Sequence, residues 1–252
     1  MTVEFQNITK QFNRESDEEV KALSDLSLSI PSRQFLVVIG ANGSGKSTLL
    51  NILSGSVTPD SGSLRIGGKD VTGSKEYVLS RVVARVFQNP QSGTAPGLTV
   101  LENFRLASLR SRPKLFKMGM DQHFKAMVRE KLSLLGLGLE SKLNQEAGTL
   151  SGGQRQALSL VMATMDQPGI LLLDEPSAAL DPRSSEVIMQ LAEKIIKEFK
   201  LTAILVTHNM KDAVRYGDRL ICLKEGRITK DIQPSEEKMK LEPASLYAWF
   251  DT

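Results

Sequence analysis

The sequence has little cysteine, few aromatic residues and no long hydrophobic run, and each shortage excludes a class of protein. Its only cysteine, Cys222, lies in the apolar stretch 220–223, which excludes an intramolecular disulfide and fits a reducing compartment. We predict that Cys222 is a small core residue. Apolar runs such as 35–39 and 170–173 are far shorter than the roughly 18 residues that a membrane-spanning helix needs. If the protein acts at a membrane, other chains must span it.

The sequence also lacks a strong charge of either sign. Its 32 basic residues nearly balance 29 acidic ones, and the net charge of +3 is spread along the chain, so we expect no nucleic-acid partner. The first residues lack the basic segment and apolar run of a signal peptide, so export is not expected. A chain of 252 residues can form one large α/β domain, alone or with a smaller inserted lobe.

Hydrophobic patterning predicts a mainly parallel sheet in an α/β fold. Leu26, Leu28 and Ile30 alternate with serines as in a half-buried strand, and an antiparallel β portion is expected near the N-terminus. A fully apolar strand is predicted at 35–39 and further apolar strands at 83–87, 170–173 and 203–206, with helices between them. The clearest helix spans 182–200, where a buried stripe is predicted for Val187, Ile188, Leu191, Ala192, Ile195, Ile196 and Phe199.

The middle of the chain loses the strand pattern. Segments 100–109 and 124–135 have helical spacing, which predicts a helical lobe inserted into the core. We divide the single domain into a core of 1–90 and 166–231, a helical subdomain of 91–165 and a tail of 232–252. The basic stretch 109–117 is interpreted as a solvated loop, and the aromatic end of the tail, 246–250, is expected to dock onto the domain.

A phosphate loop follows the strand predicted at 35–39. The segment Gly40-Ala-Asn-Gly-Ser-Gly-Lys-Ser47 fits the pattern Gly-x4-Gly-Lys-Ser/Thr and stands between a buried strand and a helix start, where backbone N–H groups can surround phosphates. Lys46 would place its charge on the β- and γ-phosphates, and Ser47 would hold Mg²⁺. ATP and Mg²⁺ are therefore the expected ligands. The residues assigned to this loop are Gly40, Ala41, Asn42, Gly43, Ser44, Gly45, Lys46, Ser47 and Thr48.

Two carboxylates follow the apolar strand at 170–173. Asp174 would lie at the carboxyl edge of the sheet and is predicted to bind magnesium. Side chains alternate along an extended chain, so Glu175 can face an attacking water instead, and we predict that it is the general base. The alternative is an acidic exit from the strand without a catalytic role.

A helix start with unusual glycines follows the predicted lobe. Ser151 and Gln154 form a capping box, but Gly152 and Gly153 each cost about 1 kcal/mol in a helix compared with alanine. Glycines at this position suggest close approach of the backbone to a ligand. We therefore predict that Ser151, Gly152, Gly153 and Gln154 form a second anion site.

Together these motifs resemble the ATPases of ABC transporters. The segments 40–48, 86–90, 150–154, 171–176, 179–181 and 207–208 occur in that family's order, and the resemblance covers nearly the whole chain. It implies that the Ser151 loop closes over ATP held by a second copy of the chain, so that a head-to-tail dimer encloses two nucleotides. It also implies that Gln88 senses Mg²⁺ and that His208 contacts the γ-phosphate.

Two residues keep alternative interpretations. Phe12 resembles the aromatic on which adenine stacks, but it could instead be a core residue. Asp181 is expected at the dimer interface and is also a good N-cap before Pro182.

The resemblance implies partners as well. A separate cassette chain would bind permease subunits at the cytoplasmic face of the membrane, as a peripheral protein, and would serve a solute-binding protein indirectly. Segments 88–97, 162–165 and 207–210 resemble cassettes of small-solute importers, some of them assigned to tryptophan or tyrosine. The alternatives are an exporter cassette or a non-transport ABC ATPase; a long coiled coil and a second phosphate loop, which would favour the latter, are absent from the sequence.

Overall fold

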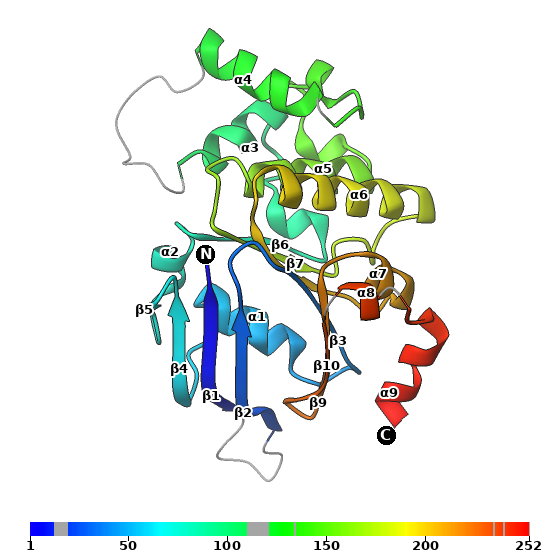
Figure 1. Ribbon diagram of the computed structural model, residues 1–252. Helices are drawn as coiled ribbons and strands as arrows, with labels where there is room; N and C mark the ends of the chain where they lie inside the picture. Colours follow the sequence, from blue (N-terminus) through cyan, green and yellow to red (C-terminus); the bar gives the residue numbers. More distant parts are fainter. Residues whose placement is uncertain (13–19, 110–120, 134, 234, 239, 252) are drawn as a thin grey trace.

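The computed structural model describes residues 1–12, 20–109, 121–133, 135–233, 235–238 and 240–251 (Figure 1). Apart from Leu109, the basic stretch predicted as a loop lies outside the described residues.

A six-stranded sheet forms the centre of the protein. Its order is β10-β9-β3-β8-β7-β6, and every neighbouring pair is parallel except β9 with β10. The four strands predicted from apolar runs are all present, and β9 and β10 extend the sheet on one side. The strands are β3 (Phe35–Ile39), β6 (Val83–Val86), β7 (Ile170–Asp174), β8 (Thr202–Val206), β9 (Arg219–Lys224) and β10 (Arg227–Ile232).

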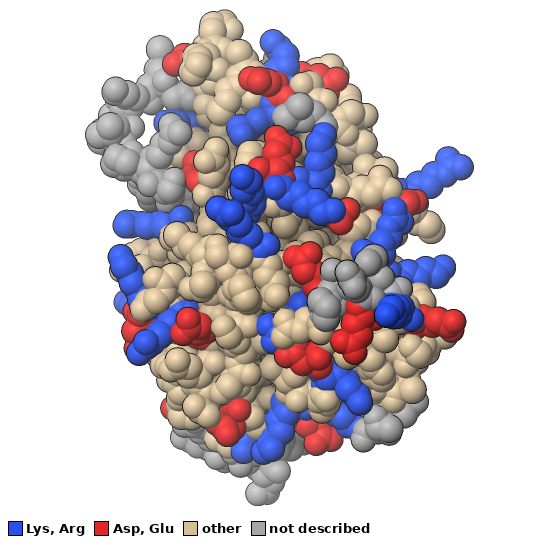
Figure 2. Space-filling model, in the orientation of Figure 1, with Lys and Arg blue, Asp and Glu red and all other residues tan. Residues whose placement is uncertain are grey.

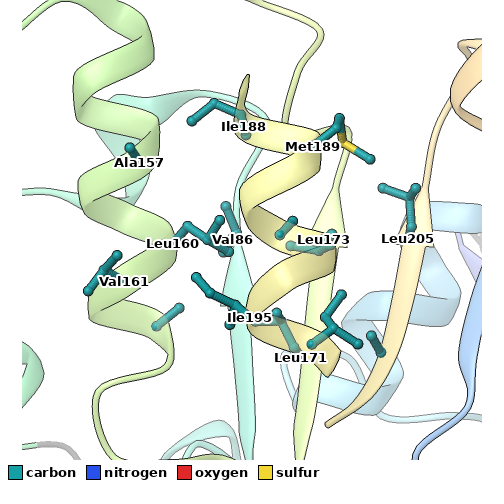
Figure 3. Close-up of a cluster of buried hydrophobic side chains, with 14 of the residues drawn as sticks. Val86, Ala157, Leu160, Val161, Leu171, Leu173, Ile188, Met189, Ile195 and Leu205 are labelled. Carbon is teal, nitrogen blue, oxygen red and sulfur yellow. The ribbon is translucent and has the colours of Figure 1, made fainter. Parts of the chain in front are cut away.

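The central strands are mainly apolar because both faces of the sheet are covered. Val37 of β3 belongs to one core and its neighbour Val38 belongs to the other. Figure 3 shows the first core, in which Leu160 and Ile195 from two helices converge beside Val86. Cys222 is fully buried in the same core, as predicted.

The second core is closed by a four-stranded antiparallel sheet of order β2-β1-β4-β5. Leu26, Leu28 and Ile30 of β2 are buried while the serines between them are exposed, so the predicted alternation is confirmed. The strands are β1 (Val3–Phe12), β2 (Val20–Ile30), β4 (Ser61–Ile66) and β5 (Lys69–Asp70).

The helices of the core pack on the central sheet. Residues Ile188, Ala192, Ile195 and Ile196 of α6 are buried, but the predicted stripe is wrong at Val187, whose side chain is 39% exposed. Each helical residue turns about 100°, so the stripe runs through Met189 instead and leaves Val187 beyond its edge. These helices are α1 (Lys46–Ser54), α2 (Glu76–Leu79), α6 (Pro182–Glu198) and α7 (Met210–Arg215).

The helical lobe is present as predicted. Figure 1 shows its three helices together at the top of the molecule, on the far side of α6 from the antiparallel sheet. They are α3 (Val100–Ala107), α4 (Gln122–Ser133) and α5 (Gly152–Ala163), joined by 3-10 turns at Pro90–Gly93, Leu139–Ser141 and Ala147–Thr149.

The end of the chain packs on the core. Leu246 is fully buried, and Trp249 and Phe250 contact the first core, which confirms the predicted docking. Buried Lys238 donates to the backbone carbonyls of Tyr216 and Gly217. The tail contains α8 (Ser235–Lys238), a 3-10 turn at Pro243–Leu246 and α9 (Ala248–Asp251).

Basic and acidic side chains intermingle over the face shown in Figure 2, without a surface of one sign. Among the helices that the structure describes, none is both long and apolar enough to span a membrane.

The buried lysine of the tail predicts a pH effect on stability. Burial lowers the pKa of Lys238 to about 8, although the carboxylates of Asp218 and Glu193 oppose the shift. Between pH 8 and 10 the unfolded chain then holds a proton that the folded chain has released, so the unfolding free energy should rise with pH through this group, by at most about 1.4 kcal/mol per pH unit. Denaturant unfolding of Lys238→Met should show a smaller rise over that range than the native chain. An identical slope in both would contradict this prediction.

Candidate functional site

The phosphate loop lies between β3 and α1, as predicted. Close packing requires two of its glycines: a Cβ on Gly40 would lie 2.3 Å from the carbonyl oxygen of Leu223, and one on Gly45 would lie 2.4 Å from that of Ala22. Gly45 also has a φ of 104°, which an L side chain rarely adopts. The loop backbone is therefore held tightly by its neighbours.

Lys46 begins α1 with its amine inside the loop. The Nζ atom donates to the carbonyls of Gly40 and Ala41, each at 2.8 Å, and the residue is buried. Burial lowers the pKa of Lys46, while the carboxylates of Glu175 and Asp174 oppose that shift. The predicted magnesium ligand Asp174 and the predicted base Glu175 therefore both attract the amine.

Asp174, the last residue of β7, and Glu175, which follows the strand, have different partners. The alternation of an extended chain is not the reason, because the backbone of Glu175 is left-handed. Asp174 pairs with Arg85, with 2.5 Å between Oδ2 and Nη2. Glu175 instead lies with Oε2 at 3.0 Å from Nδ1 of His208. Glu175 also has a left-handed backbone with a φ of 46°, an uncommon conformation for a residue with a side chain and one often found at functional sites.

Glu175 and His208 line a pocket of about 260 Å³ at the carboxyl edge of the sheet. Thr207 and Ser177 border the same pocket, so the turns after β7 and β8 both contribute to it. The carboxyl of Asp212 lies 3.5 Å from the Ser177 hydroxyl, and burial raises the pKa of Asp212. The pocket can hold a small polar group beside a carboxylate.

The Ser151 capping box is confirmed. The Ser151 hydroxyl accepts from the backbone N–H of Gln154 at 3.2 Å, and the Gln154 side chain accepts from the N–H of Ser151 at 3.4 Å. Gln154 also bonds to Lys142 and to the carbonyl of Leu137, so the motif is held within the helical lobe. Ser151 itself is exposed, where a ligand could reach it.

The structure supplies a packing reason for one of the two glycines in this motif. A Cβ on Gly153 would lie 2.8 Å from Oγ and 2.9 Å from Cβ of Ser184 in α6, so the two helices approach closely there. A Cβ on Gly152 would make only an ordinary contact, 3.4 Å from Leu180. Close approach to a ligand therefore stays a prediction chiefly for Gly152.

The remaining predicted residues lie around these loops. Asp181 caps α6 by accepting from the N–H groups of Arg183 and Ser184, so its N-cap role is confirmed. Phe12 ends β1 with 37% of its side chain exposed and Lys10 over its ring, which argues against a core role. Gln88 is exposed just after β6. Adenine stacking by Phe12 and metal sensing by Gln88 stay predictions.

Sequence reasoning missed two residues that connect the site to its surroundings. Arg85 bridges Asp174 and Asn51 of α1, and Gln156, fully buried in α5, donates to the carbonyl of Phe87 at 3.0 Å. The signal for Arg85 was a charge inside an otherwise apolar strand, because such a charge needs a buried partner.

The residues present fit magnesium bound together with a nucleotide. No group of three or more metal-binding side chains occurs among the described residues, so a complete protein cage for a metal is not found there. Magnesium usually binds through one or two protein oxygens together with substrate phosphates. Asp174 and Ser47 supply oxygen donors, and the tight loop backbone provides the phosphate cradle.

Comparison with known proteins gives a consistent result. Residues 23–178 match the family model described as ABC transporter. The chain is 39% identical over 236 residues to a tyrosine transport ATP-binding protein of Clostridioides difficile, covering 94% of each chain. It is 35% identical over 228 residues to the energy-coupling factor transporter ATP-binding protein EcfA2 of Acetivibrio thermocellus, covering 90% of this chain and 78% of the relative.

Solved structures of ATP-binding cassettes have the same fold as this chain. The dimeric ATP-binding cassette MJ0796 bound to ADP and Pi matches with a TM-score of 0.79 and 30% identity, covering 92% of this chain and 98% of that one. A nucleotide-free cassette from an ABC transporter also matches at 0.79, with 26% identity and 99% of each chain covered.

The two glycines at the start of α5 can be separated by mutation. Gly153→Ala should lower the free energy of unfolding by about 1–3 kcal/mol, because the added methyl group overpacks the contact with α6. A further Ser184→Gly change should restore much of this loss. Gly152→Ala is the matched control and should leave stability unchanged or raise it by up to about 1 kcal/mol, because alanine favours the helix and its Cβ would make only an ordinary contact. The same change should lower ATP turnover if a ligand approaches there. Denaturant unfolding measures the stability of each variant. Equal losses for both alanine variants would contradict the packing role assigned to Gly153.

Proposed function

This chain belongs to the ABC transporter family, whose cassettes hydrolyse ATP, and we propose that it is the motor subunit of an importer for a small solute. The observation that carries the motor role is the site itself: the Lys46 amine is buried inside the phosphate loop, Asp174 ends β7, and Glu175 contacts His208. An aromatic amino acid is the first solute to test, because a relative is described as a tyrosine transport protein.

The phosphate loop would hold Mg-ATP. Backbone N–H groups of residues 40–48 and the Lys46 amine would bind the phosphates, while Ser47 and Asp174 would hold Mg²⁺, with Gln88 sensing it. Magnesium would neutralise charge on the phosphate oxygens. Phe12, exposed at the end of β1, would stack on the adenine.

Glu175 would accept the proton of the attacking water. Its carboxylate borders the pocket at the sheet edge, and Nδ1 of His208 lies 3.0 Å from its Oε2, so an N–H on Nδ1 would donate to the carboxylate and hold it in place. His208 is 63% exposed at its side chain, which leaves it free to contact the terminal phosphate. The acid-base step therefore depends on a pair of side chains from neighbouring strands.

A second copy of the chain would complete each site. The Ser151 motif is held inside the helical lobe by Lys142 and Leu137, so it can present its exposed helix start to a partner. Related cassettes are described as dimeric, one of them with ADP and Pi. In a head-to-tail dimer the Ser151–Gln154 segment would cover the nucleotide of the partner subunit, with Asp181 at the interface.

Permease subunits would anchor this dimer at the cytoplasmic face of the membrane, with a solute-binding protein acting indirectly. A groove of about 400 Å³ lies between the end of β6 and helices α3 and α5, next to Gln88. Leu106 borders it with 53% of its side chain exposed. We assign this groove to a permease segment, because it joins the helical lobe to the strand that leads to the nucleotide site.

Glu175→Gln tests the catalytic role. The change keeps the side-chain shape and removes its basicity, so ATP turnover should fall by about 10²–10⁴-fold, the usual contribution of a positioned general base. Nucleotide affinity should remain within a few-fold, because the phosphate and metal ligands are unchanged. The variant should form dimers with ATP but not with ADP in size-exclusion chromatography.

Lys46→Ala is the comparison variant for Glu175→Gln, because it should lose nucleotide binding as well as turnover. Near-normal turnover of Glu175→Gln would show that the base lies elsewhere. If Glu175→Gln loses turnover but forms no ATP-dependent dimer, Glu175 remains the base. The proposal that the isolated subunit closes into a dimer on ATP would then be wrong.

Leu106→Asp tests the proposed permease surface. A charge in the groove should prevent co-purification with the permease, while ATP binding by the isolated cassette stays unchanged because Leu106 lies outside the nucleotide site. Val187→Asp changes another exposed apolar residue, on α6 and outside the groove, and is the control that should not disturb the complex. Retention of the permease by Leu106→Asp would overturn the assignment of the groove.

A further inference from the structure

Arg85 is a charged residue inside a buried strand, and its contacts converge on the predicted metal carboxylate. Its Nη2 lies 2.5 Å from Oδ2 of Asp174, and its Nη1 lies 2.6 Å from the side-chain oxygen of Asn51. The guanidinium also lies 5.0 Å from the centre of the Phe87 ring. These three contacts hold the guanidinium in one orientation, with one of its charged hydrogen bonds directed at Asp174.

The ion pair is largely shielded from solvent. The side chain of Arg85 is 15% exposed and that of Asp174 is 16% exposed, so water screens their attraction only weakly. The guanidinium therefore neutralises much of the charge that Asp174 could otherwise offer to a metal ion. A second cation bound to the same carboxylate would also be repelled by Arg85.

We propose that Arg85 is a positioning residue that competes with Mg²⁺ for Asp174 and so weakens the contribution of the metal to nucleotide binding. The proposal rests on the metal-binding role assigned to Asp174 above. Arg85 fixes one carboxylate oxygen of Asp174, and a metal must share that carboxylate with the guanidinium. In a motor that must release its nucleotide after each turnover, this competition limits how tightly the metal-nucleotide complex is held.

Arg85 also extends the metal site toward the groove assigned to the permease. The same residue borders that groove, and its Nε atom is buried without a hydrogen-bond partner among the described residues. A buried donor without a partner costs free energy, so an acceptor from a segment bound in the groove would be stabilising at this atom. Such a contact would act on the same guanidinium that holds Asp174.

Replacing the charge measures the competition directly. The dissociation constant of a fluorescent, non-hydrolysable ATP analogue is determined for each variant in saturating Mg²⁺ and in EDTA. The constant in EDTA divided by the constant in Mg²⁺ reports how much the metal contributes to binding. In Arg85→Met the carboxylate loses its partner, so this ratio should rise about tenfold, equivalent to about 1.4 kcal/mol. Arg85→Lys keeps the charge and should hold the ratio within about threefold of the native value.

Two further variants separate the possible outcomes. Arg81→Met removes the same charge from an exposed position and should leave the ratio unchanged. Asp174→Asn should lower the ratio; if it does not, the metal role of Asp174 fails and the proposal fails with it. If Asp174→Asn lowers the ratio but Arg85→Met leaves it unchanged or lowers it, Arg85 does not compete with the metal, and only the present inference is overturned. Thermal unfolding of each variant confirms that the chain is folded.

Discussion

Burial of strand β3 on both faces is the constraint on which the site depends. Val37 and Val38 enter opposite cores, so the strand can neither slide nor rotate without exposing apolar surface on one side. Its carboxyl end therefore delivers Gly40 to a defined place, where the carbonyl of Leu223 from β9 leaves no room for a side chain. The precision of the phosphate loop comes from the sheet behind it, because the loop itself has few side chains to hold it.

The same sheet brings the predicted catalytic residues together from distant parts of the sequence. Strands β7 and β8 are parallel neighbours, so the residues that follow them emerge at one edge, and Glu175 meets His208 there. Arg85 of β6 reaches the same edge and adds a positive charge beside Asp174. The site thus contains charges of both signs: the buried amine of Lys46, the carboxylates of Asp174 and Glu175, and the guanidinium of Arg85, which pairs with Asp174.

Polar contacts add to the apolar packing that joins the helical lobe to this part of the sheet. Gln156 of α5 bonds to the backbone of Phe87, one residue before Gln88, and the N-terminus of α5 packs closely against α6 at Gly153. These contacts lie next to the groove that we assign to the permease. Movement of the lobe would therefore act on the segment between Arg85 and Gln88, and through it on the nucleotide site.

The sequence by itself determined the phosphate loop, the carboxylates after β7, the capping box at Ser151 and the apolar strands, because each depends on local spacing that any fold of this class must respect. It also predicted the docking of the tail through its aromatic residues. Only the tertiary structure decided the partners of those residues. The pairing of Arg85 with Asp174, the contact between Gly153 and Ser184 and the exposure of Val187 depend on which elements become neighbours, and neighbours far apart in the chain leave no local pattern in the sequence.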